Sequence, residues 1–168
     1  MTISMYQASV PVFIRMLNNL IGILEKAAAH AEARKIDPAV LINSRLYPDM
    51  FPLARQIRIA TDAAMSGAAR LAGMEPPKFE DNEATFADLI ERVRKTIAYV
   101  SGFKPDQIDG SEKTKIELKV RDGTLILDGL TFLLNRVLPN FYFHITTTYG
   151  ILRHNGLEIG KKDYLGKF

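Results

Sequence analysis

The residues that could do chemistry gather near the C-terminal end of the sequence, in segment 140–156 (NFYFHITTTYGILRHNG). At 100° per residue, a helix here places Asn140, His144 and Thr148 on one face. A histidine beside an amide and a hydroxyl can act as a general base, coordinate a metal or hydrogen-bond a ligand. Apolar and polar residues alternate on every side of this helix, so we expect it to be internal and His144 to be at least partly buried.

Two interpretations of His144 remain open from these residues. In the first, it is a core histidine whose nitrogens are hydrogen-bonded to a carbonyl and a hydroxyl. In the second, it lies in a pocket as a ligand, a base or a hydrogen-bond partner, with Tyr149 and Arg153 on the neighbouring helix face to orient a bound molecule. Asp49 and Gln56 flank the predicted start of another helix and could reach the same pocket, although Asp49 in this position is typical of a helix cap.

Metal and cofactor chemistry is not predicted. The chain has no Cys, and its three His are dispersed at positions 30, 144 and 154. A transition-metal site needs at least three protein donors within about 2.0 to 2.3 Å of one point. We therefore expect no metal and no cofactor. Phosphate-binding glycine loops, nucleophile elbows and zinc-protease motifs are also missing from the sequence. The basic residues between 104 and 121 alternate with acidic ones and lack stacking aromatics, so no nucleic-acid partner is expected.

Apolar periodicity predicts the elements that must position these residues. Four main helices are expected near 5–35, 52–72, 86–101 and 129–155. In the last of them Pro139 interrupts the helix, and Asn140 is placed to cap its continuation. The predicted core takes one stripe from each helix: Phe13, Leu17, Leu20, Leu24, Ile57, Ala60, Ala64, Ile90, Val93, Ile97, Phe141 and Ile151.

Segment 115–128 has a different period, with apolar residues at every second position. Asp122-Gly123 favours a two-residue turn that pairs Arg121 with Thr124. The tail 158–168 is expected to pack back along the helices through Ile159, Tyr164, Leu165 and Phe168. The predicted fold class is mainly all-α, a single domain over 1–168 built as an antiparallel four-helix bundle with a β-hairpin before the last helix.

The overall composition is that of a globular protein. The 168 residues are 47% hydrophobic and 24% charged, with a formal net charge of +3, which excludes an intrinsically disordered chain. Charged and amide residues break the longest apolar stretches, and the N-terminus lacks the pattern of a signal peptide. We expect a cytoplasmic protein with no membrane contact.

Segments 139–166 and 45–57 (RLYPDMFPLARQI) resemble the two recognisable blocks of the family termed domain of unknown function nineteen-ninety-three. That family is similar to the DinB/YfiT-like four-helix bundles, which include damage-inducible proteins and metal-dependent thiol transferases. The resemblance implies a metal site with one His from the second helix and two from the last. Here the second helix has no His, and Asn140 and Thr148 stand one turn on either side of His144, so the three-His set is absent.

Two functions from different classes are consistent with these residues. The favoured one is a non-catalytic or small-ligand-binding homodimer with a pocket around His144, because helix faces of small residues suit close association between copies. The alternative is a DinB-like transferase that acts on a small thiol or a related conjugate. In that enzyme His144 would be the base or a metal ligand, and Tyr149 or Arg153 would orient the substrate.

Overall fold

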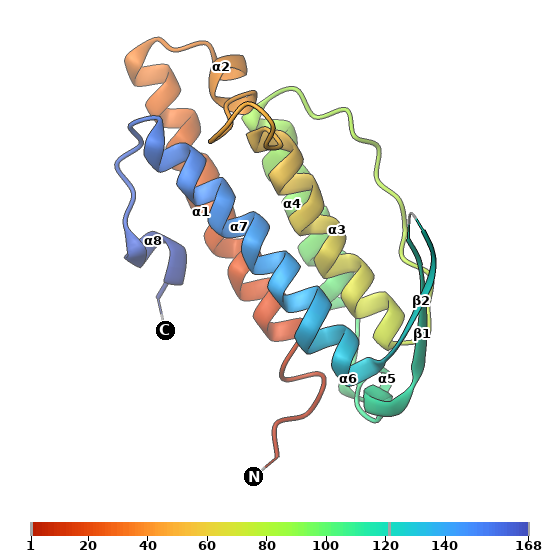
Figure 1. The fold of residues 1–168 in the computed structure, drawn as a ribbon. Helices are drawn as coiled ribbons and strands as arrows, with labels where there is room; N and C mark the ends of the chain where they lie inside the picture. Colours follow the sequence, from red (N-terminus) through yellow and green to blue (C-terminus); the bar gives the residue numbers. More distant parts are fainter. Residues whose placement is uncertain (1, 121, 168) are drawn as a thin grey trace.

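The computed structural model describes residues 2–120 and 122–167 and confirms a helical bundle with a hairpin before the last helix (Figure 1). Helix α1 packs antiparallel to α4, and α3 packs antiparallel to α7, whereas α3 and α4 run in the same direction. Segment 72–85 makes this possible because it returns along the length of the bundle before α4 begins. The long helices are α1 (Val10–Arg34), α3 (Leu53–Leu71), α4 (Phe86–Ser101) and α7 (Leu138–His154).

Helix α1 begins five residues later than its apolar stripe predicts. Residues 5–9 form turns, and Pro11 lies in the first helical turn, where its missing N–H has no helical carbonyl to bond. The predicted core is otherwise confirmed. Phe13, Leu17 and Leu24 are fully buried, and Ile97 is the one member of the predicted set that is only partly buried. A capping box is present at the start of α4, with Thr85 and Asp88 each accepting a hydrogen bond from the other's backbone N–H.

The last helical region is continuous, contrary to the predicted break at Pro139. Helix α6 (Gly129–Phe132) passes through a π-helical turn, η2 (Leu133–Val137), directly into α7. The backbone N–H of Leu138 bonds the carbonyl of Leu133, five residues back. Since Pro139 has no N–H and its ring crowds the preceding turn, a wider turn accommodates it without ending the helix. Asn140 is therefore an exposed residue inside α7 and caps nothing.

The hairpin pairs strands β1 (Lys115–Val120) and β2 (Gly123–Asp128), but its register differs by two residues from the predicted one. Thr124 pairs with Lys119, Gly123, with φ of 135°, pairs with Val120, and Asp122 lies in the turn. The expected partner of Thr124, Arg121, lies outside the described residues. A shift of two keeps every side chain on its predicted face, so Ile116 and Leu118 are still buried.

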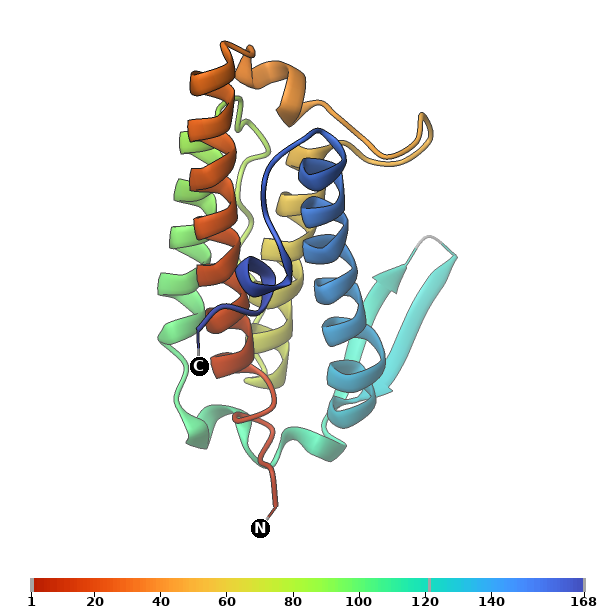
Figure 2. The same ribbon diagram turned by 90° about the vertical axis from the view of Figure 1, so that its left-hand side faces the viewer.

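Short elements complete the chain: α2 (Pro38–Ile42), α5 (Pro105–Ile108), η1 (Ser111–Lys113) and α8 (Lys161–Leu165). The tail packs against α1 as expected, and Figure 2 shows α8 lying over that helix. Arg15 and Asn19 of α1 donate to the backbone carbonyls of Leu165 and Tyr164, each at 3.0 Å. Lys26 pairs with Asp163. Phe168, the last predicted contact of the tail, is outside the described residues.

Candidate functional site

His144 and Gln56 form a buried pair where α7 crosses α3. The exposed fraction is 7% for His144 and 2% for Gln56, and 2.6 Å separates the Nδ1 atom of His144 from the Oε1 atom of Gln56. The other end of the amide is also fixed, because Gln56 Nε2 donates to the carbonyl of Phe51 at 2.9 Å. Phe51 lies just before α3 begins, so the start of this helix and the histidine are linked through one side chain.

This chain of hydrogen bonds determines the tautomer of His144. Because Gln56 Nε2 is the donor to Phe51, its Oε1 faces the imidazole and can only accept, so Nδ1 of His144 carries the hydrogen. The Nε2 atom then has a free lone pair. Burial lowers the pKa of His144, which favours this neutral form. Nε2 has no hydrogen-bond partner in the described chain. It is not fully buried either, because among the described residues Ser111 Oγ is the one side-chain N or O atom that is both fully buried and unpartnered.

Two predicted neighbours of His144 do not join it in a pocket. Thr148 is fully buried, and its hydroxyl donates to the backbone carbonyl of His144 at 2.9 Å, a contact within the helix itself. Asn140 is exposed, one turn away toward the hairpin. The structure therefore brings together Gln56 and His144, and leaves Asn140 on the adjoining surface.

The other three predicted site residues lie elsewhere. Tyr149 faces the tail, where its hydroxyl bonds the carbonyl of Ile159 at 3.4 Å and its ring contacts Tyr164. Arg153 is exposed in the last turn of α7. Asp49 is exposed in the loop before α3. The N-cap residue of this helix is Pro52, and no side chain caps it, so the predicted capping role of Asp49 is wrong. Tyr149 and Arg153 are five and nine residues beyond His144. At 100° per residue they lie on the other side of α7, away from α3.

A groove of about 670 Å³ begins one helical turn from the buried pair. Its upper lining includes Ile59, three residues after Gln56, and Asn140, four residues before His144. It continues between α3 and the hairpin, which stands beside the lower half of α7 in Figure 2. Loop 43–52 projects from the same side of the bundle at the opposite end. His144 is thus close to one end of a surface groove.

Comparison with known proteins identifies the family. Residues 5–165 match the family model described as "Domain of unknown function (DUF1993)". The chain belongs to this family. Its structure is similar to the crystal structure of a DinB family member protein from Shewanella denitrificans, with a TM-score of 0.89 and 44% sequence identity over 97% of this chain and 92% of that one. None of the curated proteins matches this chain. The resemblance inferred from segments 45–57 and 139–166 is confirmed.

The described part of this DUF1993 protein does not fit the ion that the DinB-like resemblance implies. His144 offers one imidazole nitrogen, and the oxygen of Gln56 already accepts from its Nδ1. Among the described residues, no three His, Cys, Asp or Glu side chains are grouped so that they could hold a metal ion. A three-imidazole site cannot be assembled from this donor set. In the same range, no helix is long and apolar enough to cross a membrane.

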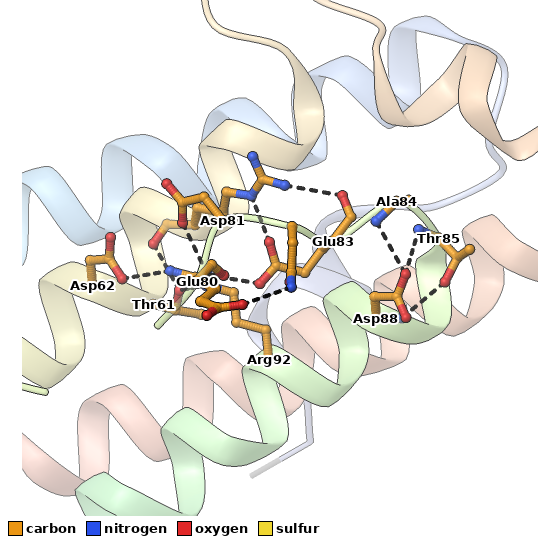
Figure 3. Close-up of polar contacts among 11 residues, drawn as sticks. Thr61, Asp62, Glu80, Asp81, Glu83, Ala84, Thr85, Asp88 and Arg92 are labelled. Carbon is orange, nitrogen blue, oxygen red and sulfur yellow. Dashed lines mark hydrogen bonds and ion pairs between the residues drawn. The ribbon is translucent and has the colours of Figure 1, made fainter. Parts of the chain in front are cut away.

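A polar cluster of the DUF1993 protein centres on Arg92 of α4, a residue to which the sequence pattern assigned no role (Figure 3). The Arg92 side chain is only 2% exposed. It donates to atoms of α3 and of segment 74–84, which we call the crossing segment: Thr61 Oγ1, Asp62, the carbonyl of Glu80, Asp81 and Glu83. Arg58 binds the carboxylate of Glu83 from α3 at 2.7 Å. We call these residues the Arg92 cluster.

The charges of the Arg92 cluster set its pKa shifts. Burial acts to raise the pKa of Glu83, but hydrogen bonds from Arg92 and Arg58 lower it overall. Burial also raises the pKa of Asp62, and there the charge of Arg92 does not fully offset it. Because the guanidinium is occupied on every side, we assign the cluster to holding segment 74–84 against α3 and α4. The signal in the sequence is an Arg within the buried stripe Leu89, Val93 and Thr96.

Proposed function

We propose that this DUF1993 protein is a non-catalytic homodimer that binds a small molecule along the seam of α3 and α7, with His144 at one end of the site. The observation that carries this proposal is the fixed tautomer of His144. Its Nε2 lone pair is oriented by the Gln56 and Phe51 contacts before any ligand arrives. Such an acceptor binds a ligand N–H or O–H without an ordering cost for the imidazole.

The partner of His144 favours binding over catalysis. A histidine that acts as a base becomes a cation, and a carboxylate partner stabilises that cation. Gln56 accepts the same hydrogen bond but carries no charge, and burial disfavours the imidazolium form. The alternative, a DinB-like transferase acting on a small thiol, would use Tyr149 or Arg153 to orient its substrate. Both lie away from the α3 side of the histidine.

The homodimer is proposed from the exposed apolar side chains around the same seam. Leu46, Tyr47 and Phe51 of the loop before α3 are exposed, as is Phe143 of α7. Leu46 lies beside Gly150, which is two turns from Phe143 and so on the same face of α7. We treat these exposed side chains as one apolar area, which a two-fold pairing of this face of the molecule with itself would bury.

The ligand is tested on untagged protein by native mass spectrometry. We expect a copurifying small molecule on the wild type and its loss in His144→Phe, which keeps a ring of similar size but has no acceptor nitrogen. Thr146→Val on the exposed side of α7 is the control, and it should retain the molecule. Turnover of a thiol substrate that depends on His144 would support the transferase and contradict the proposal.

The dimer is tested by light scattering over a wide concentration range. Wild-type protein should show about twice the 18.8 kDa of one chain. Phe143→Ser and Tyr47→Ser should shift the mass toward the monomer, since each removes an apolar contact at the centre of the area. Ile126→Ser, at an equally exposed apolar position on the hairpin, should not. A wild-type mass of one chain at every concentration would refute the dimer.

A further inference from the structure

The groove between α3 and the hairpin carries an excess of unpaired positive charge. Lys78, Lys119 and Arg136 line it, and none of them has an ion-pair partner among the described residues. Of its three carboxylates, Asp62 is bound by Arg92 and Glu75 lies 3.6 Å from Arg70. Only Glu117 is left to balance the three free cations within the described part of the groove.

Arg136 and Asn140 are placed one turn apart on the same side of the helix. Both line the groove, and both also line a smaller adjoining cavity of about 370 Å³. The π-helical turn contains Arg136 and leads into α7. A wider turn at this point changes which residues of the helix face outward. Arg136 is exposed and has no hydrogen-bond partner in the described chain, so its guanidinium is available for two parallel bonds to an oxyanion.

Neutral donors extend the site from the cationic end toward the histidine. Asn140 has an amide N–H₂ at the upper end of the groove, and Thr124 of β2 has a hydroxyl on the hairpin side. Ile59 supplies an apolar wall between Asn140 and the turn of α3 that holds Gln56. The order along the groove is therefore cations, then an amide and an apolar wall, then the His144 end.

We propose that the ligand of this groove is a small oxyanion, with its carboxylate or phosphate group held by Arg136 and Lys119 and its body directed past Asn140 toward His144. This inference rests on the proposed function, since it names the chemical class of the molecule that binds there. Lys78 adds a third positive charge from the crossing segment. The Arg92 cluster fixes that segment, so this charge is presented from a rigid wall.

The test is a two-dimensional NMR titration of the full chain at low salt, where the charge contribution is least screened. The probes are inorganic phosphate, the dicarboxylate glutarate, and glutaramide, the uncharged diamide of the same length. We expect phosphate or glutarate to shift the backbone amides of Thr124, Arg136 and Asn140, and glutaramide to leave them unchanged. A stronger response to phosphate than to glutarate assigns the oxyanion to phosphate esters, and the reverse assigns it to carboxylates.

Matched variants separate the site from general charge. Arg136→Gln should weaken anion binding about tenfold, the effect of removing a charged hydrogen-bond donor. Lys119→Gln should also weaken it. Arg34→Gln removes one exposed arginine at the far end of α1 and should leave the affinity unchanged. Both arginines are exposed, so the fold should be intact in each variant, as a circular dichroism spectrum will verify. Equal weakening by Arg34→Gln, or no shift with either anion, would overturn the inference.

The result also distinguishes this inference from the proposed function. If a neutral molecule binds next to His144 and neither anion shifts the groove amides, the ligand class is wrong and the binding function stands. If the copurifying molecule is lost from Arg136→Gln but kept by His144→Phe, the oxyanion site is supported and the role of His144 as a ligand contact is refuted.

Discussion

Substitution of Arg92 by Met gives the sharpest test of the packing described for the crossing segment. Met keeps a long unbranched stem and removes all guanidinium donors. The arginine side chain is only 2% exposed, so water cannot replace its bonds to Thr61, to the carbonyl of Glu80 and to Glu83. We expect the free energy of unfolding to decrease substantially.

The magnitude follows from what each partner loses. Asp62 and Asp81 are 53% and 57% exposed, so they regain water, and the loss of each pair contributes at most about 1 kcal/mol. Glu83 is 7% exposed but keeps Arg58 at 2.7 Å. Breaking a buried ion pair by removing one partner costs about 3 to 5 kcal/mol. Because Arg58 remains, we expect about 3 kcal/mol, the lower end of that range.

Urea unfolding followed by circular dichroism measures this loss, with Arg94→Met as the control. Arg94 is 58% exposed and pairs with an exposed Glu25, so its substitution should change the free energy by less than about 1 kcal/mol. In the double variant Arg92→Met/Glu83→Gln, the total loss should be smaller than the sum of the two single losses, since both remove the same contact. A loss for Arg92→Met no larger than that for Arg94→Met would refute the assigned role of the cluster.

Three further outcomes are expected. Leu17→Ala or Leu24→Ala should each lower the free energy of unfolding by about 2 to 5 kcal/mol, because both side chains are fully buried and a cavity adds to the lost transfer energy; losses below about 1 kcal/mol in urea unfolding would contradict that packing. Burial lowers the pKa of His144 from the ordinary value of 6.5, so the unfolded chain binds the proton more readily and stability should fall as the pH drops below about 6.5. Urea unfolding at several pH values should show that the free energy of unfolding of the wild type decreases more steeply with falling pH than that of His144→Asn. Equal dependence on pH in the two proteins would be inconsistent with a buried neutral imidazole. Protein purified without a His tag or added metal should hold well under one equivalent of Zn, Ni, Mn or Fe by elemental analysis, and a chelator should leave its melting temperature unchanged; stoichiometric metal that disappears in His144→Ala would make the metalloenzyme the leading interpretation.

The helices and the hairpin could be predicted because their signals are local. Apolar spacing, the Thr85 and Asp88 capping box and the period of two in segment 115–128 each depend on residues close together in sequence. The errors are also local, and they arose where two signals competed. A proline usually breaks a helix, but Pro11 fits in the first turn of α1 and Pro139 fits after a wider π-helical turn. A glycine after Asp is typical of a hairpin turn, but Gly123 is instead a paired residue of strand β2.

The candidate site was predictable only in part, because its contacts cross between elements. His144 and Gln56 were both recognised as candidates, but their bond depends on which face of α7 meets α3. That orientation is set by the packing of the whole bundle. The Arg92 cluster draws on α3, α4 and a loop that returns along the bundle, so no spacing in the sequence joins its members. Its one local sign is an arginine at a position whose helical neighbours are buried.

The tail shows how conformation and side-chain identity can be constrained separately in one segment. Arg15 and Asn19 hold it by the backbone carbonyls of Leu165 and Tyr164, which any amino acid supplies at those positions. Gly166 is different, because its φ is +71° and a Cβ there would collide with the Asn19 amide. The Tyr164 side chain is held as well, since its ring contacts Tyr149. In a set of related sequences, position 165 is therefore free to drift while glycine at 166 and the two donors on α1 persist. Sequence conservation at this contact should therefore be found mainly at Gly166 and at Arg15 and Asn19, about 150 positions earlier.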